Sequence, residues 1–295
     1  MRIIKAERIA QTIKELCIKA NLVLRKDVLK RLRHVFSLEK NPRARNILKA
    51  IIENARIADK QRLAICQDTG MPCVFVELGQ GVMVKGDMNA AINKGVVSGY
   101  KSGYFRRSII KDPILRGKPG YGPAVIHADI VKGNKLKLTV LPKGFGSENK
   151  SRLKMFNPTA SVKQIKEFII EAVKAAGPDA CPPYVIGVGI GGTVDYACLL
   201  AKKALLRKII PQRGIPLNKN LRRGINYRLP ITDYERKLEY DLLKEINKLN
   251  IGPMGLGGKT TALAVNIEMY PTHIAGLPVA VNISCHATRS ATAVL

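Results

Sequence analysis

The chain has 295 residues, of which 46% are hydrophobic and 5% aromatic, and its formal net charge at pH 7 is +28. This length and hydrophobic content predict a globular protein with a proper core and exclude a disordered chain. No apolar run approaches the roughly 20 residues that a membrane helix needs, and the first residues lack a signal-peptide pattern, so we expect a cytoplasmic protein without a membrane span.

The positive charge is spread along the chain rather than gathered in one place. Cationic stretches occur at residues 25–33, 101–118, 132–154 and 202–228. Nucleic-acid binding is one explanation, because lysine and arginine displace counterions from phosphates. The chain has no Trp, few aromatics and no nucleic-acid-binding motif, so we do not expect a nucleic acid as a partner. An acidic partner subunit or an anionic small substrate explains the charge as well.

The first 60 residues are expected to be helical, because apolar residues recur there at three- and four-residue spacing. Beyond Cys66, short apolar runs broken by glycine predict strands alternating with helices. Strands are expected at 74–78, 82–84, 135–140, 184–186, 261–269 and 279–284. Helices are expected at 162–175 and 233–249, and a further helix is expected to begin after the glycines that follow residue 186 and to end at residue 205. Residues 211–230 are expected to form a basic, proline-punctuated loop or linker. The fold class is therefore α/β or mixed α+β, with a helical segment (1–60) and a mixed-sheet body (61–295) in a single domain.

Two glycine-rich motifs resemble nucleotide-binding loops. Residues 187–192 fit G-x-G-x-x-G and are expected to form a loop after a strand. A dinucleotide site also needs an acidic residue about 20 positions further on, and residues 202–213 contain none, which leaves only an anion cradle at a helix start. Residues 257–260 resemble the end of a P-loop, but Pro253 stands where its first glycine belongs, and a helix is expected where a strand must precede. The chain is not expected to bind nucleotides.

Three of the six cysteines lie beside loop-forming residues, where a rigid scaffold usually presents functional side chains. Cys66, Cys181 and Cys285 are 115 and 104 residues apart, too far for a zinc knuckle or a ferredoxin run. They are either ordinary buried thiols or three thiolates that converge on an iron–sulfur cluster with one iron open to substrate. Cys17 lies on an apolar stripe and is expected in the core.

Polar residues near these cysteines are of the types that acid–base chemistry on a dicarboxylate needs. Asp68 follows Cys66 by two residues, although Asp-Thr-Gly is also good turn chemistry. His273 precedes Cys285 by twelve residues, and histidine is a common acid–base residue, although a histidine taken alone is more often structural. Arg107 is either a solvated surface charge or a fork that binds a carboxylate in two places.

These residues carry a resemblance to a known family. The motifs that carry it are Ile-Cys-Gln-Asp-Thr-Gly (65–70), Gly-Ser-Glu-Asn (146–149), Gly-Val-Gly-Ile-Gly-Gly-Thr (187–193), Gly-Pro-Met-Gly-Leu-Gly-Gly-Lys-Thr-Thr (252–261) and Ser-Cys-His-Ala (284–287). Through them the chain resembles class I fumarate hydratases and the alpha subunits of L(+)-tartrate dehydratases along nearly its whole length. The resemblance implies an oxygen-sensitive [4Fe–4S] cluster held by Cys66, Cys181 and Cys285. The other cysteines match no ligand position: Cys17, Cys73 and Cys198.

The same resemblance implies the roles of the polar residues. Asp68 and His273 match an acid–base pair, and Gln67 and Arg107 match substrate-binding positions. Adding water across a fumarate-like double bond needs a Lewis acid, a proton transfer and cations for the dianionic intermediate, and this set supplies much of that list. The expected reaction is the reversible hydration of fumarate to L-malate, a step of the tricarboxylic acid cycle, with dehydration of L(+)-tartrate to oxaloacetate as the alternative.

The sequence departs from the family in two ways. Phe145 interrupts a stretch before Ser-Glu-Asn that is usually all glycine. The chain also has no counterpart to the second domain of single-chain members, which supplies a threonine and further cations. It therefore resembles the separate alpha subunit of a two-subunit enzyme. We expect a beta subunit that completes the active site, in a heterotetramer.

Overall fold

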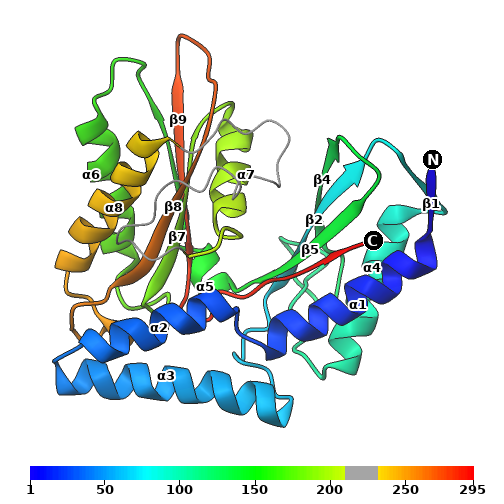
Figure 1. Ribbon diagram of the computed structural model, residues 1–295, viewed down its shortest axis with the longest axis horizontal. Helices are drawn as coiled ribbons and strands as arrows, with labels where there is room; N and C mark the ends of the chain where they lie inside the picture. The colour runs from blue at the N-terminus through cyan, green and yellow to red at the C-terminus, as the bar shows by residue number, and fades with distance from the viewer. Residues whose placement is uncertain (210–231) are drawn as a thin grey trace. The chain divides into compact units, whose positions relative to one another are not determined.

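The computed structural model describes residues 1–209 and 232–295, whose contacts divide the chain into two compact units (Figure 1). The first unit comprises Met1–Arg25, Asn54–Phe145 and Arg289–Leu295, and the second comprises Lys26–Glu53 and Gly146–Thr288. The loop expected at 211–230 lies outside the described residues. The mixed α/β class is confirmed, whereas the expectation of a single functional domain stays a prediction.

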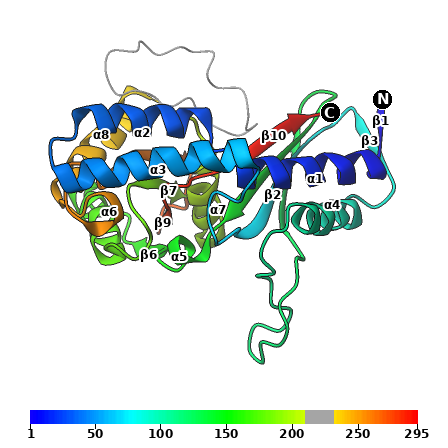
Figure 2. The same ribbon diagram turned by 90° about the horizontal axis from the view of Figure 1, so that it is seen from below.

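The first unit is built from β1 (Arg2–Lys5), α1 (Ala6–Leu22), β2 (Met71–Gly79), β3 (Val82–Lys85), α4 (Met88–Ser102), β4 (Val125–Val131), β5 (Leu136–Lys143) and β10 (Ala291–Val294). Its four-stranded sheet has the order β10-β5-β2-β4, in which β5 is antiparallel to both neighbours and β2 is parallel to β4. Strands β1 and β3 form a separate parallel pair. Helices α1 and α4 lie side by side in both views (Figures 1 and 2), and the apolar face of α1 joins the core of this unit.

The second unit contains α2 (Lys26–Leu38), most of α3 (Pro42–Gln61), α5 (Phe145–Glu148), β6 (Arg152–Phe156), α6 (Val162–Ala176), β7 (Tyr184–Gly191), α7 (Val194–Ala204), α8 (Asp233–Lys248), the short 3-10 helix η2 (Pro253–Gly255), β8 (Ala262–Tyr270) and β9 (Leu277–Ser284). Its sheet has the order β6-β9-β7-β8, with β7 parallel to β8 and antiparallel to β9. Helices α6 and α8 cover one face and α7 covers the other (Figure 1). The middle of the sheet is therefore buried on both faces, and all eight residues of β7 are buried.

Most of the elements expected from periodicity are present. The three N-terminal helices are confirmed as α1, α2 and α3, and helices α6 and α8 begin at capping boxes in which Ser161 and Thr232 are the N-caps. Cys17 is buried in the core, as expected. Helix α8 precedes the glycine turn at 257–260 with no strand between them, as expected for a segment that is not a P-loop.

The glycine loop expected at residues 187–192 is wrong, because β7 continues as a strand through Gly191. Along this strand Ile186 and Val188 face the core under α6 and α8, while Gly187 and Gly189 face α7. A Cβ atom on either glycine would lie 2.0 Å from a carbonyl oxygen of α7. These glycines let α7 approach the sheet, and their backbone pairs with β8 and β9 rather than cradling an anion.

Candidate functional site

The six cysteines differ in burial in a way that separates the expected ligands from the rest. Cys66, Cys181 and Cys285 are half-buried, whereas Cys17 and Cys73 are buried and Cys198 is exposed. Burial raises the pKa of the Cys17 thiol to about 12, so this thiol stays protonated near neutral pH. A thiol that must bind iron needs to be reachable and able to ionise, and the three expected ligands are reachable.

Within the second unit, Cys181 lies against the segment that carries Cys285. The backbone N–H of His286 donates to the carbonyl oxygen of Cys181 at 3.1 Å, and the ring Nδ1 of His286 lies 3.1 Å from the same oxygen. Because a carbonyl oxygen only accepts, the second contact requires a proton on Nδ1. Burial raises the pKa of the Tyr184 hydroxyl, and the nearby thiols of Cys181 and Cys285 raise it further. Two of the three expected ligands are thus brought together.

Cys66 belongs to the first unit, in the turn that follows α3. The backbone N–H of Ile65 donates to Asn21 at 2.9 Å, and the amide of Asn54 donates to the carbonyl of Ile65 at 2.9 Å, so the residue before Cys66 is fixed on both sides. Among the residues that the structure describes, no three His, Cys, Asp or Glu side chains are gathered closely enough to hold a metal ion. The donor set of three half-buried thiols suits an iron–sulfur cluster, and the assignment of that set stays a prediction.

Asp68 is held at both carboxylate oxygens by backbone N–H groups. Oδ1 accepts from Gly70 at 2.9 Å, which closes an Asx turn, and Oδ2 accepts from Phe145 at 2.8 Å. The structure therefore shows the turn role that the sequence left open, and the role of Asp68 in proton transfer stays a prediction. Phe145 contributes its backbone N–H here, while its side chain is exposed. Gln67 is also exposed.

His273 lies in the second unit, in the exposed segment between β8 and β9. Its Nδ1 accepts from the backbone N–H of Ala275 at 3.2 Å, so the neutral ring carries its proton on Nε2. The fixed ring therefore presents Nε2 as its proton-carrying atom. Whether this atom pairs with Asp68 stays a prediction.

Arg107 is exposed on the first unit and rests on one aromatic neighbour. Its Nε donates to the Tyr121 hydroxyl at 3.3 Å, and its guanidinium carbon lies 5.4 Å from the centre of the Tyr121 ring. The hydrogen bond to Tyr121 raises the pKa of the Arg107 guanidinium, which remains charged. The remaining N–H donors are available to an anion, as a carboxylate-binding fork requires.

A polar network on the second unit was not found by residue-level reasoning. Lys202 donates to Oε1 of Glu148 at 2.5 Å, and the amide of Asn282 donates to Oε2 of Glu148 at 2.9 Å and to the Ser151 hydroxyl at 2.9 Å. Asn282 precedes Cys285 by three residues, so the network fixes the end of β9 from which that cysteine emerges. The only sequence signal for it was the Gly-Ser-Glu-Asn motif that contains Glu148.

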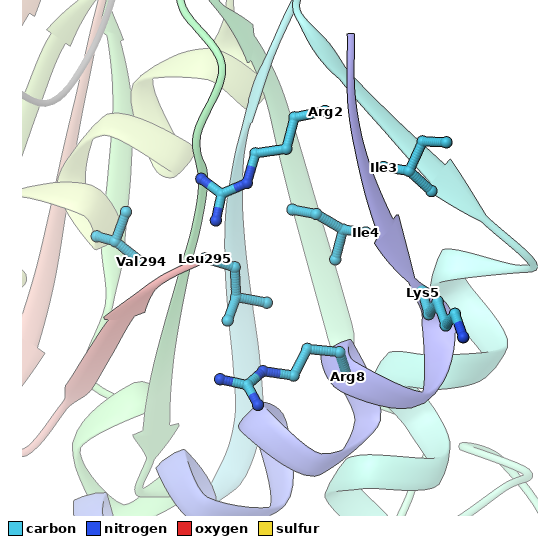
Figure 3. Close-up of a pocket in the computed structure, with 7 residues that line it drawn as sticks. All are labelled: Arg2, Ile3, Ile4, Lys5, Arg8, Val294 and Leu295. Atoms are coloured by element: carbon cyan, nitrogen blue, oxygen red, sulfur yellow. The ribbon is translucent and has the colours of Figure 1, made fainter.

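Two cavities in the described residues lie away from these side chains. One, of about 370 Å³, is lined by Arg2, Ile3, Ile4, Lys5, Arg8, Val294 and Leu295, with the side chains of Arg2 and Arg8 turned toward the last strand (Figure 3). The other, of about 820 Å³, follows β6 and α6 between Lys154 and Glu171. Neither contains a residue expected to bind iron or substrate.

Comparison with known proteins decides the family. The family model for fumarate hydratase (fumerase) matches residues 10–294. The chain belongs to this family. A putative L(+)-tartrate dehydratase subunit alpha of Methanocaldococcus jannaschii is 39% identical over 293 residues, which is 96% of each chain. The L(+)-tartrate dehydratase subunit alpha of Escherichia coli strain K12 is 27% identical over 270 residues, 90% of this chain and 84% of its own.

The resemblance drawn from the motifs is therefore confirmed, and membership of the fumarate hydratase family supports a hydro-lyase. No helix in the described part of the chain is long and apolar enough to cross a membrane.

Proposed function

We propose that this chain is the alpha subunit of an iron–sulfur hydro-lyase that interconverts fumarate and L-malate. The observation that carries the proposal is the contact between Cys181 and the Cys285–His286 segment, in a chain that matches the fumarate hydratase family over residues 10–294. Cys66, as the third half-buried thiol, completes the ligand set. A [4Fe–4S] cluster bound there would supply a Lewis acid for the addition of water.

The protein's own residues would handle the proton and the substrate's charge. Asp68, oriented by two backbone N–H groups, and His273, with its proton on Nε2, form the acid–base pair. Arg107 binds a substrate carboxylate through the N–H groups that Tyr121 leaves open, and Gln67 contributes a polar contact.

L(+)-tartrate is the second candidate substrate, and the names of the two relatives favour it. Tartrate and malate differ by one hydroxyl group, so a few pocket contacts decide between them. Turnover rates on fumarate, L-malate and both tartrate enantiomers, measured with one enzyme preparation, discriminate the two.

A beta subunit is the expected partner, because both relatives are named as alpha subunits. It would supply a base on the far face of the substrate, which the residues assigned here lack. A heterotetramer with two copies of each subunit follows from the prevalence of two-fold symmetry. The expected cytoplasmic location, where free thiols stay reduced, stays a prediction.

The test of the cofactor is an iron and sulfide determination on protein purified without oxygen. Cys66→Ser, Cys181→Ser and Cys285→Ser should each lose the cluster or retain a damaged one. Cys198→Ser is the matched control, since Cys198 is free and exposed but is no expected ligand. Full iron and sulfide content in the Cys181→Ser protein would contradict the assignment. A chain that never takes up iron but binds DNA would support the alternative of a basic nucleic-acid-binding protein.

A further inference from the structure

Arg289 is a buried cation with no acidic partner in the described residues. The side chain belongs to the first unit and is 3% exposed. One of its nitrogens, Nη2, donates to the backbone carbonyl of Asp68. Its Nε and Nη1 are also buried, and among the described residues neither has a hydrogen-bond partner. Burying a guanidinium in this way is unfavourable, so its position calls for a reason beyond packing.

Arg289 contacts the loop at residues 68–70. Buried side chains donate hydrogen bonds to the three consecutive backbone carbonyl groups of this loop. The carbonyl of Asp68 accepts from Arg289, and those of Thr69 and Gly70 accept from the Tyr100 hydroxyl at 2.9 and 3.1 Å. Tyr100 is 1% exposed. The Thr69 hydroxyl also accepts from the backbone N–H of Arg106 at 3.1 Å. The loop is therefore fixed by the buried side chains of Arg289 and Tyr100, which cannot move without disturbing the core.

The carboxylate of Asp68 is fixed from the other side. Its two oxygens accept the N–H groups of Gly70 and Phe145. The direction of a short side chain follows from the orientation of its own backbone, so the bond to the Asp68 carbonyl also sets where the carboxylate points. A hydrogen bond from an ionised donor is roughly twice as strong as a neutral one, which gives a reason for an arginine at this place.

We propose that Arg289 is a positioning residue for Asp68, acting through a charge-assisted hydrogen bond to the Asp68 carbonyl. The proposal deepens the proposed function, because the value of this positioning to catalysis rests on the role of Asp68 in proton transfer. Arg289 itself is assigned no contact with substrate or cluster. Its contribution is to keep the carboxylate in one orientation.

The test that needs no activity is hydrogen exchange at the amides of Gly70 and Phe145, which donate to the Asp68 carboxylate. Arg289→Met should speed exchange at both amides about tenfold, while amides in α4 keep their protection. Arg31→Met is the matched control, because Arg31 also donates to a backbone carbonyl, that of Leu263 at 3.2 Å, on the second unit. Unchanged exchange at Gly70 and Phe145 in a folded Arg289→Met protein would overturn the proposal.

Kinetics on the assembled enzyme give the second readout. Arg289→Met should lower kcat at least tenfold with KM changed less than threefold, and Arg289→Lys should recover more of kcat than Arg289→Gln. If the three variants fold but their kcat values do not follow this order, the result would contradict a role for the charge-assisted hydrogen bond. If Arg289→Met does not fold, Arg289→Gln and Arg289→Lys remain, and Arg289→Gln should speed exchange at Gly70 more than Arg289→Lys does.

The two proposals fail separately. If exchange at Gly70 and Phe145 rises while Asp68→Asn keeps full turnover, Arg289 positions Asp68 and the proposed proton transfer is wrong. If Asp68→Asn is inactive and the exchange does not change, the role of Asp68 stands and the role of Arg289 is wrong.

Discussion

Asp68 combines a fixed orientation with partial exposure, which is what a proton-transferring carboxylate requires. Asp68→Asn replaces one acceptor oxygen by a donor facing a backbone N–H and removes the ionisable group. We expect kcat to fall at least about 100-fold, the lower end for general acid–base catalysis, with iron and sulfide content unchanged. His273→Asn should behave in the same way. Near-normal turnover of Asp68→Asn with a full cluster would contradict the assigned role.

Arg107 is expected to act through geometry as well as charge. Arg107→Lys keeps the charge but loses the planar fork, so KM should rise roughly tenfold or more, since a hydrogen bond to a charged group is worth about 1.5–3 kcal/mol. The change in kcat should be smaller. Tyr121→Phe serves as the control, because it keeps the ring under Arg107 and removes only the 3.3 Å contact. An Arg107→Lys enzyme with unchanged KM would show that Arg107 does not bind substrate.

The buried thiol of Cys17 predicts a dependence of stability on alkaline pH. Burial raises its pKa from 9.0 to about 12, so the folded protein holds this proton more tightly than the unfolded chain. The stabilisation is complete below pH 9 and is lost as the pH rises toward 12, at up to about 1.4 kcal/mol per pH unit. Urea unfolding of wild type and Cys17→Ala at pH 8 and pH 10 measures this. The stability difference between the two proteins should narrow at pH 10; parallel pH curves would contradict the prediction.

Residue identity singled out the members of the candidate site, whose roles stay predictions, but it did not predict the contacts that hold them. The motif contexts singled out Cys66, Cys181, Cys285 and Asp68 because each stands in a short local pattern. The hydrogen bonds of His286 to Cys181 and of Arg289 to Asp68 join residues 105 and 221 positions apart. No local pattern encodes such pairs, since they depend on how the strands and turns are assembled.

At the scale of elements, periodicity predicted most helices and apolar strands. It failed for elements whose sequences carry no clear hydrophobic periodicity. Strand β6 has four exposed residues out of five, and β10 is only four residues long, so neither carries a clear alternation. Helix α4 contains Gly95 and Gly99 at its buried face, which weakens its helical signal. The second half of β7 was predicted to be a loop because glycine usually marks turns. In the structure its glycines are strand residues on which α7 packs directly.

The packing of α7 on β7 can be tested at Gly189. An added Cβ atom would lie 2.0 Å from the carbonyl oxygen of Ala197, so Gly189→Ala forces helix and strand apart. We expect a loss of about 3 kcal/mol or more of unfolding free energy in urea, the upper range for overpacking. Gly257→Ala is the control, with a φ of +77° but no atom within 4 Å of the new methyl group. It should cost only about 1–2 kcal/mol from backbone strain, and equal losses in the two variants would refute the packing argument.

At the scale of the whole molecule, the charge of +28 is the feature that the fold does not explain. Like charges on a compact chain repel one another and are screened only beyond a Debye length of about 8 Å at physiological salt. An acidic or less basic partner would relieve this repulsion and associate quickly at low salt. The charge therefore supports a heteromeric assembly and disfavours close packing of two copies of this chain alone.

This chain is predicted to need a partner subunit for activity. The isolated chain, with its cluster reconstituted without oxygen, should hydrate fumarate at least about 100-fold more slowly than the complete enzyme, since the residues assigned here lack a base on the far face of the substrate. Adding a candidate beta subunit should restore turnover, and the rate of association should fall steeply as salt rises. A basic protein of similar size, added instead, is the control. Full turnover by the isolated chain would place the missing base within these 295 residues and would refute the divided active site.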